Sequence, residues 1–447
     1  MRINRLVFLL FLYLGLNLQA SGNINIEEVS TNKGFKFLFV ENCDLPKVLV
    51  NISFKDAGYA YENYKKQGLA WITSLIVQEG AGKNDAEYFA KNLEDKGVSL
   101  NFIADLEAFK ISLNTLSENL EDAISLLSDA IMRPRIDSKG MNRVFAKAKV
   151  IFNNLEKDPY FIAGRELETL LFKKHPYSKS GYGTLNTLMG ITRDDILTYI
   201  KRNFAKDNMV ISVVGCTTKE EIITLLDKYL SKLPLKRSKV EKISVKRDFS
   251  PAESKSIFMD IPQSIILFAQ KGIEYEDSSY YDASVLINAL GGMRLNSILM
   301  KELRQNLGIT YNISASIVPK KHGSIITGLV STDSSTAAQA ISAVKDIFSR
   351  IKMEGIDEQL FKDTKIGLIN NFIFSLSNNA NIAMLLDDIQ TNNLDIIRIN
   401  DYTNNIKNVT LEEVNKLAGF LLDPENLFFV EVGRNVKVNN DFNMSKL

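Results

Sequence analysis

The chain has 447 residues, of which 45% are hydrophobic and 24% charged, and its formal net charge is +1. This composition is typical of a folded globular protein with two or three domains. A charge this close to zero argues against a global field that recruits nucleic acid or an anionic membrane. The two cysteines, Cys43 and Cys216, show no C-x-x-C spacing for metal or redox chemistry. We interpret them as separate thiols, with one long-range bridge as the alternative.

The first 20 residues have the pattern of a secretory signal peptide. Arg2 and Arg5 form a basic start, residues 6–18 are apolar but short for a bilayer span, and Ala20 is a small residue suited to cleavage. An uncleaved membrane anchor is the alternative, because Leu18 is larger than signal peptidase prefers at that position. We therefore expect an exported protein, located in the periplasm of a Gram-negative bacterium.

The remaining chain contains an internal repeat. Residues 208–215 form an apolar run that starts at Asn and ends at Gly, and residues 426–433 repeat this pattern 218 positions later. At the same offset, Thr192 and Thr410 each precede two acidic residues, which is the pattern of a helix N-cap with acids in the first turn. Conserved order and spacing indicate two copies of one structural unit.

Further echoes place the boundary between the two copies. Residues 97–102 resemble residues 308–313, again in the same order along the chain. We predict an N-terminal domain at residues 21–233, a linker at 234–251, where prolines and Lys-Arg pairs interrupt the apolar pattern, and a homologous C-terminal domain at 252–447.

Each copy mixes strand and helix patterns. Residues 110–113 and 325–330 alternate as half-buried strands do, whereas residues 120–131 and 335–351 carry apolar residues at helical spacing. The elements do not alternate regularly, so a parallel sheet is not expected. The predicted fold class is α+β, with each domain a mainly antiparallel sheet and helices packed on one face.

Short motifs occur in a characteristic order along the chain: Gln67-Gly68-Leu69-Ala70, Lys174-His175-Pro176-Tyr177, Asp207-Asn208-Met209, Ile261-Pro262-Gln263, Leu290-Gly291-Gly292 and Gly308-Ile309-Thr310-Tyr311. Together with the repeat, they resemble the insulinase/pitrilysin-type zinc metallopeptidases. The short two-domain branch, like the mitochondrial processing peptidase, is the most similar. The resemblance covers nearly the whole chain after the signal segment.

The zinc motif of that family is absent at the position where the resemblance places it. Catalytic members carry H-x-x-E-H after the Gly-Leu-Ala stretch, with two histidines as zinc ligands and the glutamate activating water. Here Trp71, Ser74 and Leu75 occupy the three functional positions. The distal glutamate ligand would fall within residues 150–154, which contain no acid, and we place the nearby Glu156 on a solvated helix face. The resemblance thus implies no zinc in this chain and zinc in a partner subunit.

The histidine content leads to the same prediction without the family. A catalytic zinc site needs about three protein ligands, usually including histidine. His175 and His322 are the only two histidines, and they lie far apart in turn-like contexts. We expect each to be a structural or surface residue.

The resemblance also implies substrate-binding residues in the second domain. We expect a helix at 293–305 ending near Arg304, a turn at 306–308 and a strand at 309–315 bearing Tyr311. In the resembled family, an Arg and a Tyr at this spacing bind the substrate backbone beside the scissile bond. The structural alternative is an Arg near a helix end and a Tyr packed in a strand.

Residues 101–109 are a second candidate for peptide binding, as an edge strand that pairs with an extended substrate, and a buried strand is the alternative. We therefore predict a non-catalytic, substrate-binding subunit of an exported heterodimeric insulinase-like zinc endopeptidase. In this interpretation Arg304 and Tyr311 complete the active site of a homologous H-x-x-E-H partner. The alternatives are a structural or assembly protein and a peptide-binding protein that does not cut.

Overall fold

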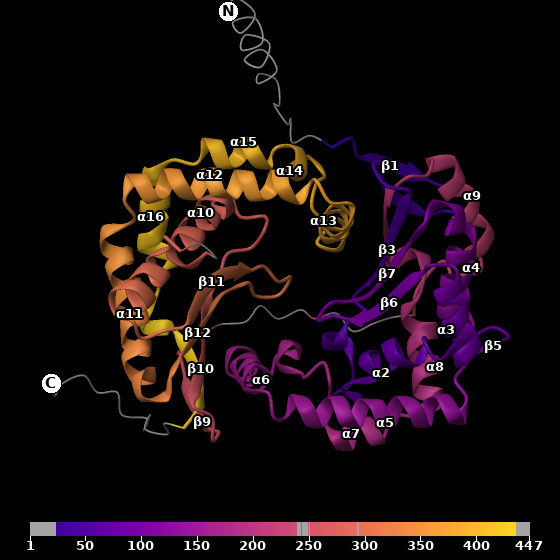
Figure 1. Cartoon of the computed structure of the whole chain (residues 1–447), viewed down its shortest axis with the longest axis horizontal. Coiled ribbons are helices and arrows are strands. Elements are labelled where there is room, and N and C mark those ends of the chain that lie inside the picture. The colour runs from indigo at the N-terminus through magenta and orange to yellow at the C-terminus, as the bar shows by residue number, and fades with distance from the viewer. Residues whose placement is uncertain (1–23, 239–242, 244–248, 250, 293–294, 435–447) are drawn as a thin grey trace, which may run out of the picture.

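The computed structural model describes residues 24–238, 243, 249, 251–292 and 295–434 (Figure 1). The predicted signal peptide lies outside these residues, as do most of the predicted linker and the start of the predicted helix 293–305. In the part of the chain that is described, no helix is both long and apolar enough to cross a membrane.

The first domain is a six-stranded sheet in the order β1-β2-β8-β3-β7-β6, and only β2 and β8 pair in parallel. Helices cover its outer face (Figure 1). The strands are β1 Glu27–Ser30, β2 Lys36–Glu41, β3 Lys47–Lys55, β6 Ser99–Ala104, β7 Ala108–Leu116 and β8 Met209–Gly215, with a small hairpin of β4 Gly80–Ala81 and β5 Asn84–Asp85. The helices are α2 Leu69–Ile76, α3 Ala86–Asp95, α4 Leu120–Met132, α5 Ser138–Leu155, α6 Pro159–Phe172, α7 Leu185–Met189, α8 Arg193–Asn203 and α9 Lys219–Tyr229.

The second domain is a five-stranded sheet in the order β11-β12-β10-β13-β9, and only β13 and β9 pair in parallel. Its strands are β9 Ser254–Phe258, β10 Gln263–Lys271, β11 Asn312–Val318, β12 Ile325–Asp333 and β13 Phe428–Gly433. Its helical segments are α10 Tyr280–Gly291, the π-helical turn η6 Met300–Asn306, α11 Ala337–Glu354, α12 Glu358–Ser375, α13 Asn379–Thr391, α14 Ile397–Asn400, α15 Tyr402–Asn408 and α16 Leu411–Leu421. Apart from β1, the two strand orders correspond one to one, which confirms the predicted α+β class with two related domains.

The two predicted N-caps are confirmed. The Thr192 hydroxyl accepts the Asp195 amide at 3.2 Å, and the Asp195 carboxylate accepts the Thr192 amide at 2.8 Å. Thr410 and Glu413 form the same reciprocal pair at the start of α16. Each capping box satisfies two amides that the first helical turn leaves unpaired, so the local sequence alone specifies where these helices begin.

The two domains exchange one helix each. Helix α6 of the first domain packs on β10 and β13 of the second sheet, and α13 of the second domain packs on β3 and β8 of the first (Figure 1). Leu167 and Leu171 of α6 share a buried cluster with Ile265 and Val430 of the second sheet. The prediction of helices on one face was therefore incomplete, because part of each second face is covered by the other domain.

The contact of α13 with the first sheet is also a buried apolar cluster. Ile382 and Leu386 of α13 are buried against Leu38 and Val214 of the first sheet. Full burial of such an aliphatic side chain contributes about 1.5–3 kcal/mol. The domain interface is thus a true hydrophobic core, and each domain depends on the other to cover its sheet.

Cys43 and Cys216 form a disulfide, so the interpretation of two separate thiols was wrong. The bridge follows from strand order. Strands β2 and β8 are parallel neighbours, with Glu41 opposite Gly215, and each cysteine lies just beyond the end of its strand. The two side chains therefore meet at one edge of the sheet although 173 residues separate them.

Candidate functional site

The site is built around α2, the helix that begins directly after Gly68. The buried Glu62 carboxylate accepts the amides of Gly68 at 2.9 Å and of Ala70 at 2.5 Å, at the positive end of this helix. Burial raises the pKa of Glu62 to about 8, although both amide bonds lower it. Gly68 has φ +89°, a left-handed conformation that glycine adopts without strain. These contacts fix the start of α2 and hence the orientation of Trp71, Ser74 and Leu75.

These three side chains line a cavity of about 510 Å³, which we call the socket. Its walls come from five parts of the first domain, namely the short turn Tyr59–Tyr61, α2, the end of β6, helix α6 and the loop before α7. The socket is lined by Tyr59, Trp71, Ser74, Leu75, Phe102, Ile103, Ala104, Phe161, Gly164, Arg165, Glu168, Ser180, Gly181 and Tyr182. Aromatic and aliphatic side chains predominate among them.

The residues of the socket do not fit a zinc ion. The Ser74 hydroxyl donates to the backbone oxygen of Trp71 at 2.7 Å, and the Trp71 ring packs edge-on against Tyr182 with centroids 4.8 Å apart. Trp71 and Leu75 offer no imidazole, thiolate or carboxylate, which are the side-chain groups that bind zinc. Among the residues that the structure describes, no group of three or more His, Cys, Asp or Glu side chains is placed to hold a metal.

The distal ligand position is equally unsuited to zinc. Residues 150–154 lie on α5 and include no acid. Glu156, at the end of α5, forms an ion pair with Arg165 of α6 and is partly exposed. Its carboxylate is thus engaged by a cation rather than aimed at α2.

Two charged side chains line the socket, and each has a counter-ion. Arg165 pairs with Glu156 and lies over the Phe161 ring, 5.5 Å from its centroid. The Glu168 side chain is 34% exposed, and Lys320 from the second domain approaches its carboxylate at 3.9 Å. Burial raises the pKa of Glu168, and Lys320 partly offsets that effect. The socket is therefore apolar with balanced charges.

The mouth of the socket is a sheet edge. Strand β6 is the last strand of its sheet and pairs with β7, and no other described strand pairs with it. Ile103 on this strand is 58% exposed. The edge position is confirmed for residues 101–104, whereas residues 108–109 belong to β7, inside the sheet, and the pairing with a peptide stays a prediction. An unpaired edge of this kind offers backbone donors and acceptors to an added strand.

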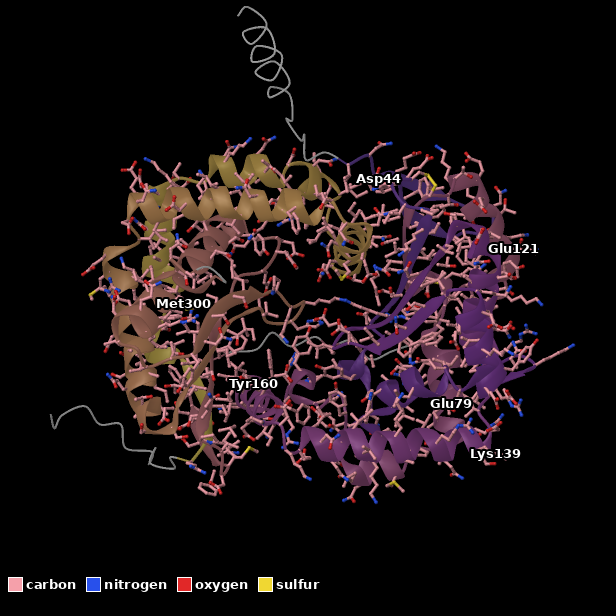
Figure 2. The ribbon with its side chains drawn as sticks, viewed as in Figure 1. Asp44, Glu79, Glu121, Lys139, Tyr160 and Met300 are labelled. Atoms are coloured by element: carbon pink, nitrogen blue, oxygen red, sulfur yellow. A yellow bond between two sulfur atoms is a disulfide. The ribbon has the colours of Figure 1, made fainter. Side chains whose placement is uncertain are left out.

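Arg304 and Tyr311 lie in the second domain and do not line the socket. Arg304 belongs to the turn η6, which starts at Met300 (Figure 2), and its guanidinium lies 3.9 Å from the Met300 sulfur. The predicted strand at 309–315 was wrong at its start, because β11 begins at Asn312. Tyr311 lies just before it, 60% exposed, and donates its amide to the Ser331 oxygen at 2.9 Å. The structure describes no contact between these two side chains, and their substrate-binding role stays a prediction.

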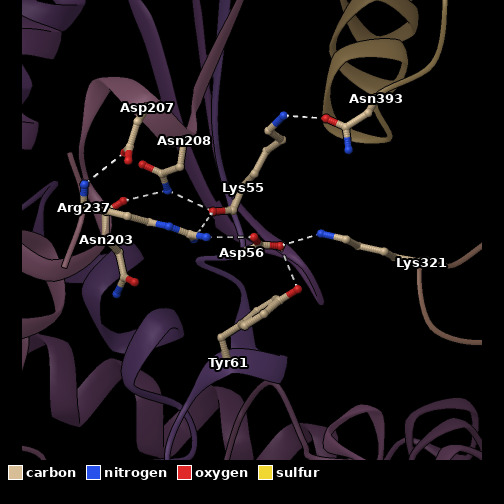
Figure 3. Close-up of polar contacts among 9 residues, drawn as sticks. All are labelled: Lys55, Asp56, Tyr61, Asn203, Asp207, Asn208, Arg237, Lys321 and Asn393. Atoms are coloured by element: carbon tan, nitrogen blue, oxygen red, sulfur yellow. Dashed lines mark hydrogen bonds and ion pairs between the residues drawn. The ribbon is translucent and has the colours of Figure 1, made fainter. Parts of the chain in front are cut away.

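A polar cluster around Asp56 joins the domains and was not predicted (Figure 3). The Asp56 carboxylate accepts from Lys321 at 2.9 Å, from Arg237 at 2.9 Å and from the Tyr61 hydroxyl at 2.7 Å. Lys321 lies on the loop between β11 and β12, so the carboxylate links the first domain, the segment after α9 and the second domain. Burial opposes its ionisation, yet these partners lower the pKa of Asp56 to about 2.

The two histidines lie close together in the fold although 147 positions separate them in the sequence. His175 and His322 face each other across the domain boundary, with ring centroids 6.2 Å apart. His175 is buried, and its Nδ1 accepts the Tyr177 amide at 3.2 Å, which is a structural use of the ring. Nearby, Lys55 donates to the Asn393 side chain at 2.7 Å across the same boundary (Figure 3). No sequence signal predicted these contacts.

Fold and site together define a two-domain peptidase architecture in which apolar residues replace the metal ligands. Family models match it: the model of the insulinase peptidase family M16 covers residues 42–185, and that of the M16 inactive domain covers residues 190–368. The chain belongs to the M16 family of insulinase-type peptidases.

Relatives and solved structures agree. A protein of Helicobacter pylori named as a non-peptidase homolog, YmxG, is 25% identical over 81% of this chain and 84% of its own length. The β subunit of the mitochondrial processing peptidase of Neurospora crassa is 23% identical over 52% of this chain and 49% of its own. A structure described as a peptidase M16 inactive domain from Pseudomonas fluorescens matches with a TM-score of 0.84, 24% identity and coverage of 92% of this chain and 98% of its own. The structural likeness shows a shared fold.

Proposed function

We propose that this chain is the non-catalytic, substrate-gripping subunit of an exported heterodimeric M16 zinc peptidase. Its partner is a homologous chain that carries H-x-x-E-H and the zinc ion, and Arg304 and Tyr311 complete the partner's site. The observation that carries the proposal is the socket itself. The start of helix α2 is held by Glu62, and the helix lies beside the edge strand β6. Trp71, Ser74 and Leu75 provide none of the groups that a zinc peptidase needs at these positions.

The relatives support a subunit rather than a solitary enzyme. One is named as a non-peptidase homolog and another as a subunit of a processing peptidase. Arg304 and Tyr311 have exposed side chains, so both can reach a second chain. A guanidinium and a phenol supply the donors that bind backbone carbonyl oxygens of a substrate.

Export is supported by the disulfide between Cys43 and Cys216. Structural disulfides persist in oxidising compartments such as the periplasm and are rare where thiols are kept reduced. This agrees with the signal-peptide pattern of residues 1–20.

The experiment is a reconstitution with the most similar H-x-x-E-H homologue from the same genome. Both chains are co-purified, and cleavage of an unstructured fluorogenic peptide is compared for the pair and for the partner alone. We expect the pair to be at least about tenfold more active, since interactions made at the reacting bond commonly contribute that much. Arg304→Ala is expected to abolish the gain, and the exposed Arg133→Ala in the first domain is the matched control. Full activity of the partner alone, or an unchanged Arg304→Ala pair, rejects the proposal.

A second candidate is a peptide-binding protein that does not cut. The apolar socket beside an unpaired strand edge favours it, because neither feature needs a metal. It predicts that this chain alone binds unfolded peptide and that no homologue stimulates or is stimulated by it.

A further inference from the structure

We infer that the socket holds one large apolar side chain of an extended peptide whose backbone adds to the edge of β6. This inference rests on the proposed peptide-gripping function and names the class of residue that the grip selects. A position that binds metal in active relatives would thus serve as a side-chain subsite in this chain.

The size and walls of the socket fit such a side chain. A cavity of about 510 Å³ lies within the range of roughly 300–1,000 Å³ that small-ligand sites occupy. Trp71 and Leu75 line it from α2, Phe102 and Ile103 from β6, and Phe161 from α6. An apolar side chain placed among them loses its contact with water and gains close packing.

The paired charges of the socket argue against a charged occupant. Arg165 already pairs with Glu156, and Glu168 already has Lys320 beside it. A Lys, Arg, Asp or Glu side chain entering the socket would lose its hydration without gaining an unshared counter-ion. Charge complementarity therefore favours an uncharged occupant.

The strand edge supplies the rest of the binding. Residues 102–104 belong to β6 and also line the socket, so a peptide paired with this edge passes over the mouth. Successive side chains of an extended peptide point to opposite sides, and one in every two can point into a pocket below. Backbone pairing then provides affinity for any sequence, and the socket selects among residues.

Trp71 is the only tryptophan of the chain, so its fluorescence reports on the socket directly. The mature chain is titrated with unstructured ten-residue peptides that differ at one central position, and binding is followed by fluorescence anisotropy. A peptide with a central p-bromophenylalanine is expected to quench Trp71 through its heavy atom. The phenylalanine peptide is expected to bind at least tenfold tighter than the alanine peptide, and the lysine peptide no tighter than alanine.

Ile103 provides the variant, because it is 58% exposed and tolerates change without loss of fold. Ile103→Asp is expected to weaken the phenylalanine peptide at least tenfold. Ile366→Asp on α12, at an isoleucine that is also 58% exposed, is the matched control and is expected to leave binding unchanged.

Any one of three results overturns the inference. These are binding of the p-bromophenylalanine peptide without quenching of Trp71, tighter binding of the lysine peptide than of the phenylalanine peptide, and unchanged peptide binding by the Ile103→Asp variant. These results are separate from the reconstitution assay. If the partner is stimulated normally but the socket fails these tests, only the subsite hypothesis is rejected. If the chain passes these tests but never stimulates a partner, only the heterodimer proposal is rejected.

Discussion

Replacing Asp56 by Asn is expected to lower the free energy of unfolding by about 2 kcal/mol at pH 7. The carboxylate accepts from Lys321 and Arg237, each at 2.9 Å, and from Tyr61 at 2.7 Å. Asp56 has φ +55°, and Asn adopts the left-handed conformation about as readily as Asp. The substitution therefore removes the charge and leaves the backbone unstrained.

The magnitude follows from the lowered pKa of Asp56. Its pKa is about 2 in the folded chain, against 3.8 as the ordinary value. This difference corresponds to about 2 kcal/mol at pH 7. It is an upper figure, because the side chain is 22% exposed and solvent screens part of the attraction. Since the folded pKa is the lower one, the stabilisation is complete well above pH 3.8 and is lost as the pH falls towards 2.

Urea unfolding of both proteins at pH 7 and at pH 3 checks this reasoning. The deficit of Asp56→Asn is expected to shrink by roughly half at pH 3, where the wild-type carboxylate has lost part of its advantage. Asp95→Asn, at an exposed carboxylate near the end of α3, is the matched control. A deficit below about 0.5 kcal/mol at pH 7 would contradict the structure of the cluster, since that is the usual scatter of surface changes. A deficit of equal size at both pH values would show that charge is not the cause.

Reduction of the Cys43–Cys216 bridge is expected to cost about 3–5 kcal/mol of unfolding free energy, because it releases a constraint across 173 residues of the unfolded chain; equal urea midpoints with and without reductant would refute this. Leu167→Ala and Leu386→Ala, one in each exchanged helix, are each expected to cost about 2–5 kcal/mol in a single cooperative transition of the whole chain; separate transitions for the two domains would refute the shared core. Restoring H-x-x-E-H at residues 71–75 is expected to give weak zinc binding, because α5 offers no distal acid; stoichiometric zinc that survives dialysis, measured by elemental analysis, would show a third ligand elsewhere.

Local signals made much of the fold predictable from sequence. Thr192 and Thr410 could be identified as helix starts because a capping box is complete within four residues. The repeat then linked β8 with β13, since each run ends in a glycine at the same offset. Strand order is not local, however. The disulfide was misjudged because Cys43 and Cys216 meet only once β2 and β8 are known to be parallel neighbours.

The candidate site was likewise predictable from the sequence only in part. Trp71, Ser74 and Leu75 were found from their distance to the Gly-Leu-Ala motif, so the loss of the zinc motif was visible without a structure. The remaining walls were not, because β6 and α6 reach the socket from positions about 30 and 90 residues further along the chain, and their side chains carry no motif. Strand β11 begins later than predicted because the Ile309 amide donates to the Leu303 oxygen of η6 at 2.9 Å instead of to the sheet, and Tyr311 therefore lies before the strand.

The exchange of α6 and α13 also predicts what happens when the chain is cut between its two domains. It gives the single polypeptide the contacts of a swapped dimer, in which each half-length unit lends its partner a helix. Besides supplying Arg237 to Asp56, the predicted linker at 234–251 then raises the effective concentration of one half near the other. Cutting the chain within residues 234–251 should leave two fragments that stay associated. In either fragment alone, part of one face of the sheet would be exposed to water.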